Sequence, residues 1–223
     1  DPRTHEPHRK GKKMGTVLSA KGCVARCTFC HRWDKGFRAI PVPQIIAAVR
    51  ELKTRYNVGF IQFSDENFGS DKRQLTEFIT EIKKEDVLYT VGGVRVKSVD
   101  PDILRRMKDS GCVSLYYGIE SGSPAILEMM EKKATLQDNI NAAKWTQEAG
   151  IFTIFQMVLA MPGESPETIR ETIEFLKQAS GSLRWWKDKA PSEITSINYA
   201  QALPGTPLYE YAREHGFIGT TLD

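Results

Sequence analysis

Short apolar runs alternate with amphipathic segments along almost the entire chain. The runs are rich in β-branched and aromatic residues and are bounded by polar or glycine-containing turns, a pattern that is typical of buried β-strands. The predicted strands span residues 14–20, 58–64, 87–94, 112–119, 151–160 and 194–200.

The segments between these runs carry apolar residues at helical spacing. In 43–56, for example, Ile45, Val49 and Leu52 fall on one face. Polar residues suited to helix capping precede several of these segments, and two of them are followed by proline, which favours the first helical position. The predicted caps are Ser70, Asp100, Thr135 and Ser165. The predicted helices span 43–56, the stretch after Ser70, 101–110, 124–132, 136–149, 166–179 and 207–215.

Strands that alternate with helices predict a parallel sheet with helices outside it, because right-handed crossovers return each strand beside the previous one. Two α/β architectures satisfy this pattern. One is a doubly wound open sheet, and the other is a partial (β/α)6 barrel. The pattern alone does not choose between them.

Composition narrows the class of protein. The chain has 223 residues, of which 26% are charged and 40% hydrophobic, as in an ordinary globular protein. A net charge of +3 is too mild to indicate nucleic-acid binding. No apolar run approaches the ~20 residues that span a membrane. Residues 1–13 are polar and basic, and we expect a linker or tail from an upstream domain there, with the core domain at 14–223.

Three of the four cysteines lie within eight residues, as Cys23, Cys27 and Cys30, spaced C-x3-C-x2-C. This clustering favours metal chemistry in a reducing compartment, which we take to be the cytoplasm, over a disulfide framework. Iron–sulfur clusters are usually held by four thiolates. Three thiolates on one loop would hold three irons of a [4Fe–4S] cluster and leave the fourth iron open to a small molecule. Cys112 stands alone and is expected to be a small buried hydrophobe.

Two other uses of the loop stay open. The first is a structural zinc site with His31 as the fourth ligand, although Cys30 and His31 are adjacent and would reach one tetrahedral ion with difficulty. The second is an electron-transfer module. Both predict a closed site, with a fourth protein ligand.

The loop 23–30 resembles the signature of the radical S-adenosylmethionine (SAM) superfamily. Four further segments, 65–67, 118–123, 161–164 and 203–209, resemble motifs of that family and occur in its order. The resemblance implies the partial (β/α)6 barrel, a [4Fe–4S] cluster and SAM. In the family the open iron chelates SAM, and an electron from the cluster cleaves it to methionine and a 5′-deoxyadenosyl radical. That radical abstracts a hydrogen atom from the second substrate.

Ligands of parallel α/β folds bind beyond the carboxyl ends of the strands, and several polar residues follow predicted strands here. Asp65, Glu66 and Asn67 would hold the SAM amino group, or would form an acidic cluster before the next helix. Glu120, with Ser121, would accept hydrogen bonds from ribose hydroxyls, or would belong to a capped turn.

The remaining candidates come from the resemblance. Gln156 would contact the SAM ribose, or would bond to a neighbouring strand. Lys132 would pair with the SAM carboxylate, or would end a helix in solvent, and Arg95 is a further candidate for that pocket. Phe29 and Met161 would lie beside adenine. Side chains that could face the reaction cavity are His31, Trp33, Tyr116, Tyr117, Tyr199 and Gln201.

Within the superfamily the chain resembles the branch whose members carry a cobalamin-binding domain before the radical domain. The resemblance implies cobalamin-dependent methylation, with methylthiotransfer, rearrangement or oxidation as alternatives. It also implies a small-molecule or biosynthetic-intermediate substrate and an electron donor such as flavodoxin or ferredoxin. Cobalamin would be bound by a domain outside this chain.

Overall fold

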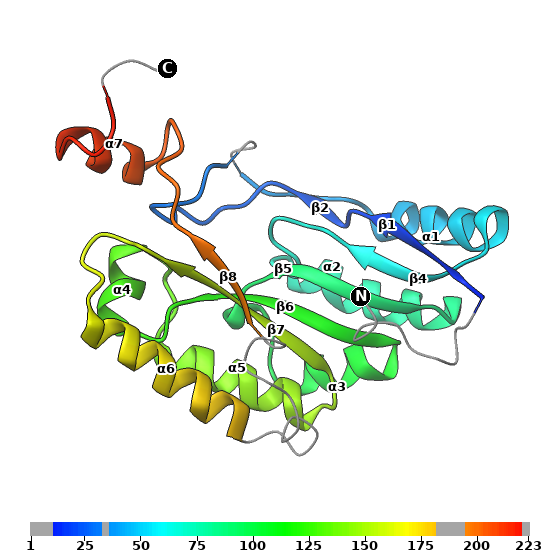
Figure 1. Ribbon diagram of the computed structural model, residues 1–223. Helices are drawn as coiled ribbons and strands as arrows, with labels where there is room; N and C mark the ends of the chain where they lie inside the picture. The colour runs from blue at the N-terminus through cyan, green and yellow to red at the C-terminus, as the bar shows by residue number, and fades with distance from the viewer. Residues whose placement is uncertain (1–10, 33–35, 182–194, 220–223) are drawn as a thin grey trace.

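The computed structural model describes residues 11–32, 36–181 and 195–219 (Figure 1). Most of the predicted linker 1–13, together with Trp33, lies outside the described residues.

Six parallel strands form one curved sheet, in the order β1-β4-β5-β6-β7-β8 (Figure 1). Their bounds are β1 (Lys13–Val17), β4 (Val58–Phe63), β5 (Leu88–Val94), β6 (Cys112–Glu120), β7 (Phe152–Leu159) and β8 (Thr195–Tyr199). Each strand lies beside its predecessor in the chain, so the crossovers all turn in one sense and the sheet curls into a half-barrel. The six predicted strands and the partial barrel are confirmed. A doubly wound sheet, whose strand order reverses, is excluded.

A second, very small sheet was not predicted. Its strands β2 (Ala20–Lys21) and β3 (Arg38–Ala39) pair antiparallel, and the loop between them carries the three clustered cysteines. This pair closes the base of the loop and fixes it next to the end of β1.

All seven predicted helices are present. Figure 1 shows α3, α5 and α6 along the outer side of the sheet, and α7 beyond the end of β8. The bounds are α1 (Val42–Tyr56), α2 (Lys72–Ile82), α3 (Pro101–Asp109), α4 (Pro124–Met129), α5 (Leu136–Glu148), α6 (Pro166–Gly181) and α7 (Pro207–Glu214). Two short 3₁₀ turns, η2 (Lys83–Glu85) and η3 (Val96–Ser98), join helices to strands.

The helix caps follow their predicted chemistry with one exception. Asp100 accepts from the N–H of Ile103, and Thr135 forms a reciprocal capping box with Asp138. The prediction of Ser70 as a cap was wrong, because the next residue, Asp71, accepts from two N–H groups of the first turn of α2.

The predicted helix at 124–132 was too long. It ends at Met129, and Glu131 and Lys133 follow with φ angles of 48° and 57°, in the left-handed region that ends a helix. Lys132 therefore lies in an irregular segment between α4 and α5.

The main core lies between the sheet and the helices. Its aromatic centre joins Phe63, Phe78 and Tyr89, with edge-on ring contacts at 5.0–5.8 Å between centroids. Cys112 is fully buried in this core, as expected, and burial raises the pKa of its thiol. The other face of the sheet carries smaller apolar clusters, one of which contains Phe60 and Leu88.

Candidate active site at the carboxyl end of the sheet

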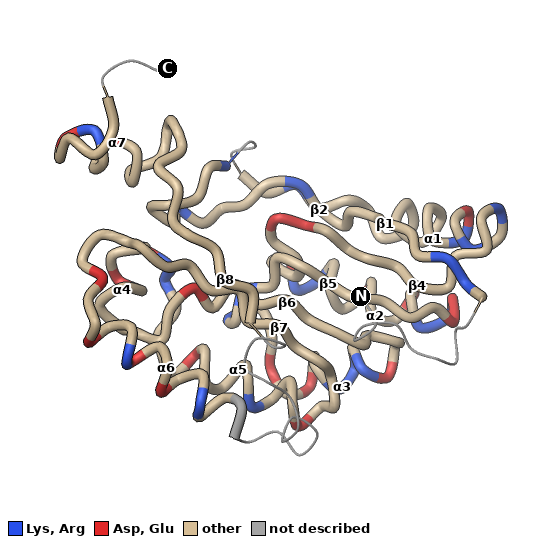
Figure 2. The backbone as a smooth tube through the Cα atoms, viewed as in Figure 1, with Lys and Arg blue, Asp and Glu red and all other residues tan. Residues whose placement is uncertain are grey.

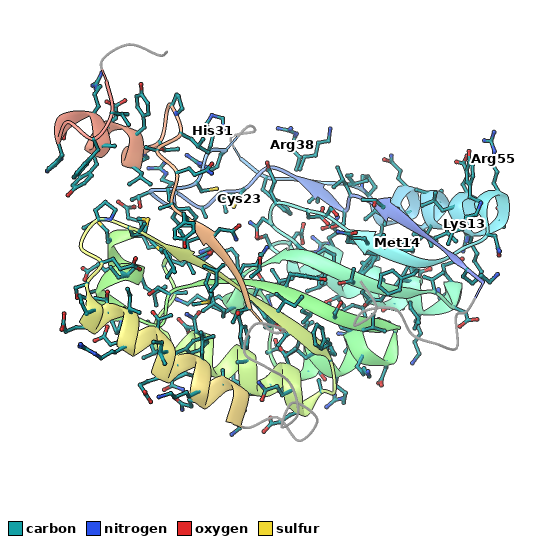
Figure 3. All side chains as sticks on the ribbon, in the orientation of Figure 1. Lys13, Met14, Cys23, His31, Arg38 and Arg55 are labelled. Carbon is teal, nitrogen blue, oxygen red and sulfur yellow. The ribbon has the colours of Figure 1, made fainter. Side chains whose placement is uncertain are left out.

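The cysteine loop is fastened to two neighbouring segments through Thr28. The backbone N–H of Thr28 donates to the carbonyl of Met130 at 3.0 Å, and its hydroxyl donates to the carbonyl of Met129 at 3.0 Å. The Thr28 carbonyl accepts from the N–H of Leu208 at 3.0 Å. The loop is therefore held between the end of α4 and the start of α7. Figure 3 labels Cys23 and His31 on it.

The three clustered thiols differ in exposure but interact electrostatically. Cys27 is buried, Cys23 is half-buried and Cys30 is the most exposed. Desolvation raises the pKa of the Cys30 thiol, and the negative charges of Cys27 and Cys23 raise it further. Lys132 acts in the opposite direction, so its ammonium also lies within electrostatic range of this loop.

The donor set fits an iron–sulfur cluster. Iron–sulfur clusters are held by cysteine thiolates, and this loop presents three free thiols, of which Cys23 and Cys27 interact electrostatically with Cys30. In the part of the chain that the structure describes, no three His, Cys, Asp or Glu side chains are placed to share one metal ion.

A buried ion pair lies beside this loop. The ammonium of Lys132 donates to Oε1 of Glu120 at 2.6 Å, and the two residues are only 7% and 8% exposed. The sequence predicted both residues as SAM contacts but did not predict that they pair with each other. A buried pair of opposite charges can exchange partners with a ligand that carries both ammonium and carboxylate or hydroxyl groups.

The backbone of β6 makes room for this pair. Glu120 has a φ angle of 66°, and the register between β6 and β7 shifts between Gly118 and Glu120. A Cβ atom at position 118 would lie 2.5 Å from Oε1 of Glu120 and 2.8 Å from Nζ of Lys132. A side chain at residue 118 would therefore force the carboxylate and the ammonium to shift.

Arg95 does not meet a carboxylate in the described part of the chain. Its guanidinium instead donates to the backbone carbonyl of Lys132 at 2.8 Å. Arg95 therefore contacts the main chain of Lys132, the other residue that was predicted to face the SAM carboxylate.

The three candidate residues in the turn after β4 differ in burial and in hydrogen bonding. Asp65 is buried, and its Oδ1 accepts from the N–H groups of Ser19 and Ala20 at 2.8 and 2.5 Å. Asp65 therefore anchors the chain that leads into the cysteine loop, and burial raises the pKa of its carboxyl. Glu66 is exposed. Asn67 is fully buried, and its two side-chain polar atoms have no partner among the described residues.

The turn after β6 is closed by hydrogen bonds to α6. The Ser121 hydroxyl lies 3.1 Å from that of Thr172 and accepts from the N–H of Ser123 at 3.0 Å. The N–H of Gly122 donates to the same threonine at 3.0 Å. The Ser121 side chain is therefore committed to the turn, which positions Glu120.

Gln156 lies next to Gly118 in the register of β6 and β7. It is half-buried. Its side chain makes no hydrogen bond within the described residues, so the amide is available at the open face of the sheet.

Phe29 and Met161, which were both predicted to lie beside adenine, share one part of the site. Both belong to an apolar cluster with Ile126, Met130 and Val158. A cavity of about 730 Å³ opens beside them. Its walls are formed by the residues Phe29, Cys30, His31, Val158, Asn198, Tyr199, Ala200, Gln201, Leu203 and Pro204.

The predicted cavity residues fall into two groups. His31, Tyr199 and Gln201 line this cavity, and Tyr199 is 71% exposed. Tyr117 does not face it, because its ring lies in the main core and its hydroxyl bonds to Thr146. Tyr116, on the opposite face of β6, packs against Phe152 and Ile154.

Sequence reasoning missed Thr28 and Thr172. Their roles depend on contacts with residues 101 and 50 positions away, respectively, which no local pattern reports. The sequence offered one signal for Thr28, namely its place between two cysteines of the C-x3-C-x2-C loop.

Residues 17–176 match the family model described as the radical SAM superfamily. The chain belongs to the radical SAM superfamily. This confirms the family predicted from the cysteine spacing and supports the predicted cofactors, SAM and a [4Fe–4S] cluster. The match runs from the last residue of β1 through most of α6, and hence covers the loop, Glu120 and Lys132.

Similar proteins include an uncharacterized methyltransferase of Pyrococcus horikoshii, which is 30% identical over 215 residues. The alignment covers 94% of this chain but 44% of that protein. This chain therefore spans less than half the length of that relative.

Two solved structures share the fold. The cobalamin-dependent SAM radical enzyme OxsB, with aqua-cobalamin and SAM bound, matches with a TM-score of 0.75 and 19% identity, over 91% of this chain and 35% of that one. The methyltransferase TsrM from Kitasatospora setae, with tryptophan and a SAM analogue bound, also matches with a TM-score of 0.75 and 19% identity. That match covers 93% of this chain and 40% of TsrM.

No helix among the described residues is long and apolar enough to cross a membrane.

Proposed function

We propose that this chain is the radical-forming domain of a cobalamin-dependent radical SAM methyltransferase. The observation that carries the proposal is the placement of the three-cysteine loop within electrostatic range of the Lys132 ammonium, which is paired with Glu120. A cluster at the loop and a ligand at the ion pair would then be neighbours, as the family's chemistry requires.

The chain's own residues have separate tasks in this proposal. Cys23, Cys27 and Cys30 hold the cluster, which when bound would supply the electron that cleaves SAM. Glu120 accepts from the ribose hydroxyls, and Lys132 turns its ammonium toward the SAM carboxylate. After this exchange Lys132 again has a negatively charged partner, and the Glu120 carboxylate keeps hydrogen-bond donors.

The remaining candidates shape the pocket around SAM. Phe29 and Met161 supply an apolar wall for adenine, and Gln156 offers a free amide to the ribose or to the second substrate. Within the described residues the buried polar atoms of Asn67 have no partners, and such atoms are rare in folded proteins, which supports a ligand contact there.

Cobalamin would come from a domain outside the described residues. The similarity to OxsB and TsrM supports this part of the proposal, because OxsB is cobalamin-dependent and TsrM is a methyltransferase. We propose that residues 1–13 link that domain to the barrel. The methyl acceptor would be a small molecule or a biosynthetic intermediate.

Reduction of the cluster calls for a one-electron donor, for which we propose an acidic flavodoxin or ferredoxin. Residues 12–50 include the cysteine loop and carry eight basic residues and one acid, Asp34. Figure 2 shows basic positions along β1 and β2. The basic residues are Lys12, Lys13, Lys21, Arg26, Arg32, Lys35, Arg38 and Arg50. An excess of basic residues around the loop would attract a partner of opposite charge and accelerate its association.

The deciding experiment is electron paramagnetic resonance on anaerobically reconstituted, reduced protein, with and without SAM. We expect a [4Fe–4S]⁺ signal that changes shape when SAM is added. A Cys30→Ala variant should lose the cluster, whereas Cys112→Ala should retain it, because Cys112 is buried in the core. A zinc-loaded protein without a cluster signal, or a signal that ignores SAM, would contradict the proposal.

A further inference from the structure

The segment between α4 and α5 joins the cysteine loop to the buried ion pair. At one end, the carbonyls of Met129 and Met130 accept hydrogen bonds from Thr28. Two residues later, the Lys132 ammonium bonds to Glu120. The position of this segment therefore sets the distance between the two halves of the site.

The end of α4 holds only the first part of this segment, through the N–H groups of Glu131 and Lys132, which donate to the carbonyls of Glu128 and Leu127 at 2.9 and 3.2 Å. Glu131 and Lys133 flank Lys132, and both adopt left-handed φ angles, which non-glycine residues reach only at an energetic cost. Such a conformation persists only where surrounding contacts impose it. The contact at the centre is the hydrogen bond from the Arg95 guanidinium to the Lys132 carbonyl, at 2.8 Å.

Arg95 is well placed for this task. It is the residue that directly follows β5 and precedes η3, so its main chain is fixed by the sheet. A guanidinium donates strongly to a carbonyl because it is charged and its donors are rigid.

From these contacts we infer that Arg95 is a positioning residue, which holds Lys132 so that its ammonium stays on Glu120. The part of this inference that concerns SAM binding rests on the proposed function. Its structural content, the restraint on Lys132, can be measured without SAM.

The test compares Arg95→Met with wild type by lysine acylation under limiting reagent, followed by mass spectrometry that separates Lys132 from Lys133. In the wild type, the Lys132 side chain is 9% exposed and that of Lys133 is 77% exposed, so Lys133 serves as an internal reference. We expect Arg95→Met to raise the Lys132 labelling rate at least fivefold relative to Lys133. Arg95→Lys should restore slow labelling, because an ammonium can donate to the same carbonyl.

The same variants are then compared by SAM affinity. We expect Arg95→Met to raise the Kd for SAM roughly tenfold, with unchanged iron content and an unchanged cluster signal before SAM is added. Arg106→Met is the matched control, because Arg106 also reaches a backbone carbonyl, that of Thr76, but on α3. That variant should change neither labelling nor affinity.

The outcomes separate the two proposals. Unchanged Lys132 labelling in Arg95→Met, or a loss of folding that Arg95→Lys does not restore, overturns the positioning role. If Arg95→Met raises the labelling of Lys132 but the wild-type protein binds no SAM, the positioning role is supported and the proposed function is overturned.

Discussion

Gly118 lies directly beneath the carboxylate of Glu120, two positions before it in β6. A methyl group at residue 118 would lie 2.5 Å from Glu120 Oε1 and 2.8 Å from Lys132 Nζ, which is closer than real contacts allow. The absence of a side chain at residue 118 therefore leaves the space in which Glu120 and Lys132 pair. The two charged side chains can move, whereas the strand beneath them cannot.

We therefore expect Gly118→Ala to displace the ion pair and weaken SAM binding by at least tenfold, while the thermal midpoint falls by only a few degrees. Gly92→Ala is the matched control on the adjacent strand, because a Cβ at residue 92 would meet only the Phe63 carbonyl, at 3.6 Å. Calorimetric titration with SAM measures the difference. Equal affinities for the two alanine variants would show that the pair is not part of the ligand site.

Replacing Lys132 by Met should destabilise the protein, because it leaves the buried Glu120 carboxylate without its counter-charge. Breaking one side of a buried pair costs roughly 3–5 kcal/mol. The double variant Glu120→Gln with Lys132→Met should recover most of that loss, since neither remaining group is charged. Urea unfolding of the three proteins measures these free energies. If the double variant is as unstable as the single one, the loss arises from packing rather than from the unpaired charge.

The sequence was sufficient for the elements whose signals are local. Strands such as β4 and β7 are predominantly apolar runs, and Asp100 and Thr135 occupy cap positions with the expected chemistry. The pair β2–β3 was missed because two-residue strands have no periodicity to detect. The early end of α4 was missed because neither Glu131 nor Lys133 belongs to a residue type that prefers a positive φ angle.

The candidate site residues could be chosen from the sequence, but the partners that they have within the chain could not. Glu120 and Lys132 were each assigned to a ligand, but they meet each other across twelve positions. Asp65 was assigned to the SAM amino group, yet backbone donors 45 and 46 positions away occupy its Oδ1. Tertiary contacts of this kind leave no trace in a local pattern, although the choice of residue type was informative in each case.

The buried Asp65 carboxyl should make stability depend on pH in an identifiable direction. Its pKa is raised in the folded state above the ordinary value of 3.8, because burial disfavours the charged form. Between the two pKa values the folded state binds more protons than the unfolded state, so stability falls as pH rises through this window. Its contribution is fully present below the ordinary pKa.

Asp65→Asn should remove this slope, because an amide oxygen still accepts from Ser19 and Ala20 but does not ionise. We expect the free energy of unfolding of the wild type, relative to the variant, to decrease as pH rises from the ordinary carboxyl pKa through the acidic range. Urea unfolding of the metal-free proteins at a series of pH values measures this difference. A difference that grows with rising pH would mean that hydrogen bonding to the carboxylate outweighs its burial.

Thr28→Val should make the cluster easier to lose without changing which residues bind it. Valine keeps the shape of threonine and the backbone bonds to Met130 and Leu208, but it removes the hydroxyl bond to the Met129 carbonyl. Such a bond contributes about 1 kcal/mol, so we expect iron to pass to a chelator about fivefold faster under anaerobic conditions. Thr80→Val is the matched control, since its hydroxyl bonds to the Thr76 carbonyl within α2, away from the loop. Iron release that is equally fast in both variants, or unchanged in Thr28→Val, would show that the hydroxyl does not hold the cysteine loop to α4.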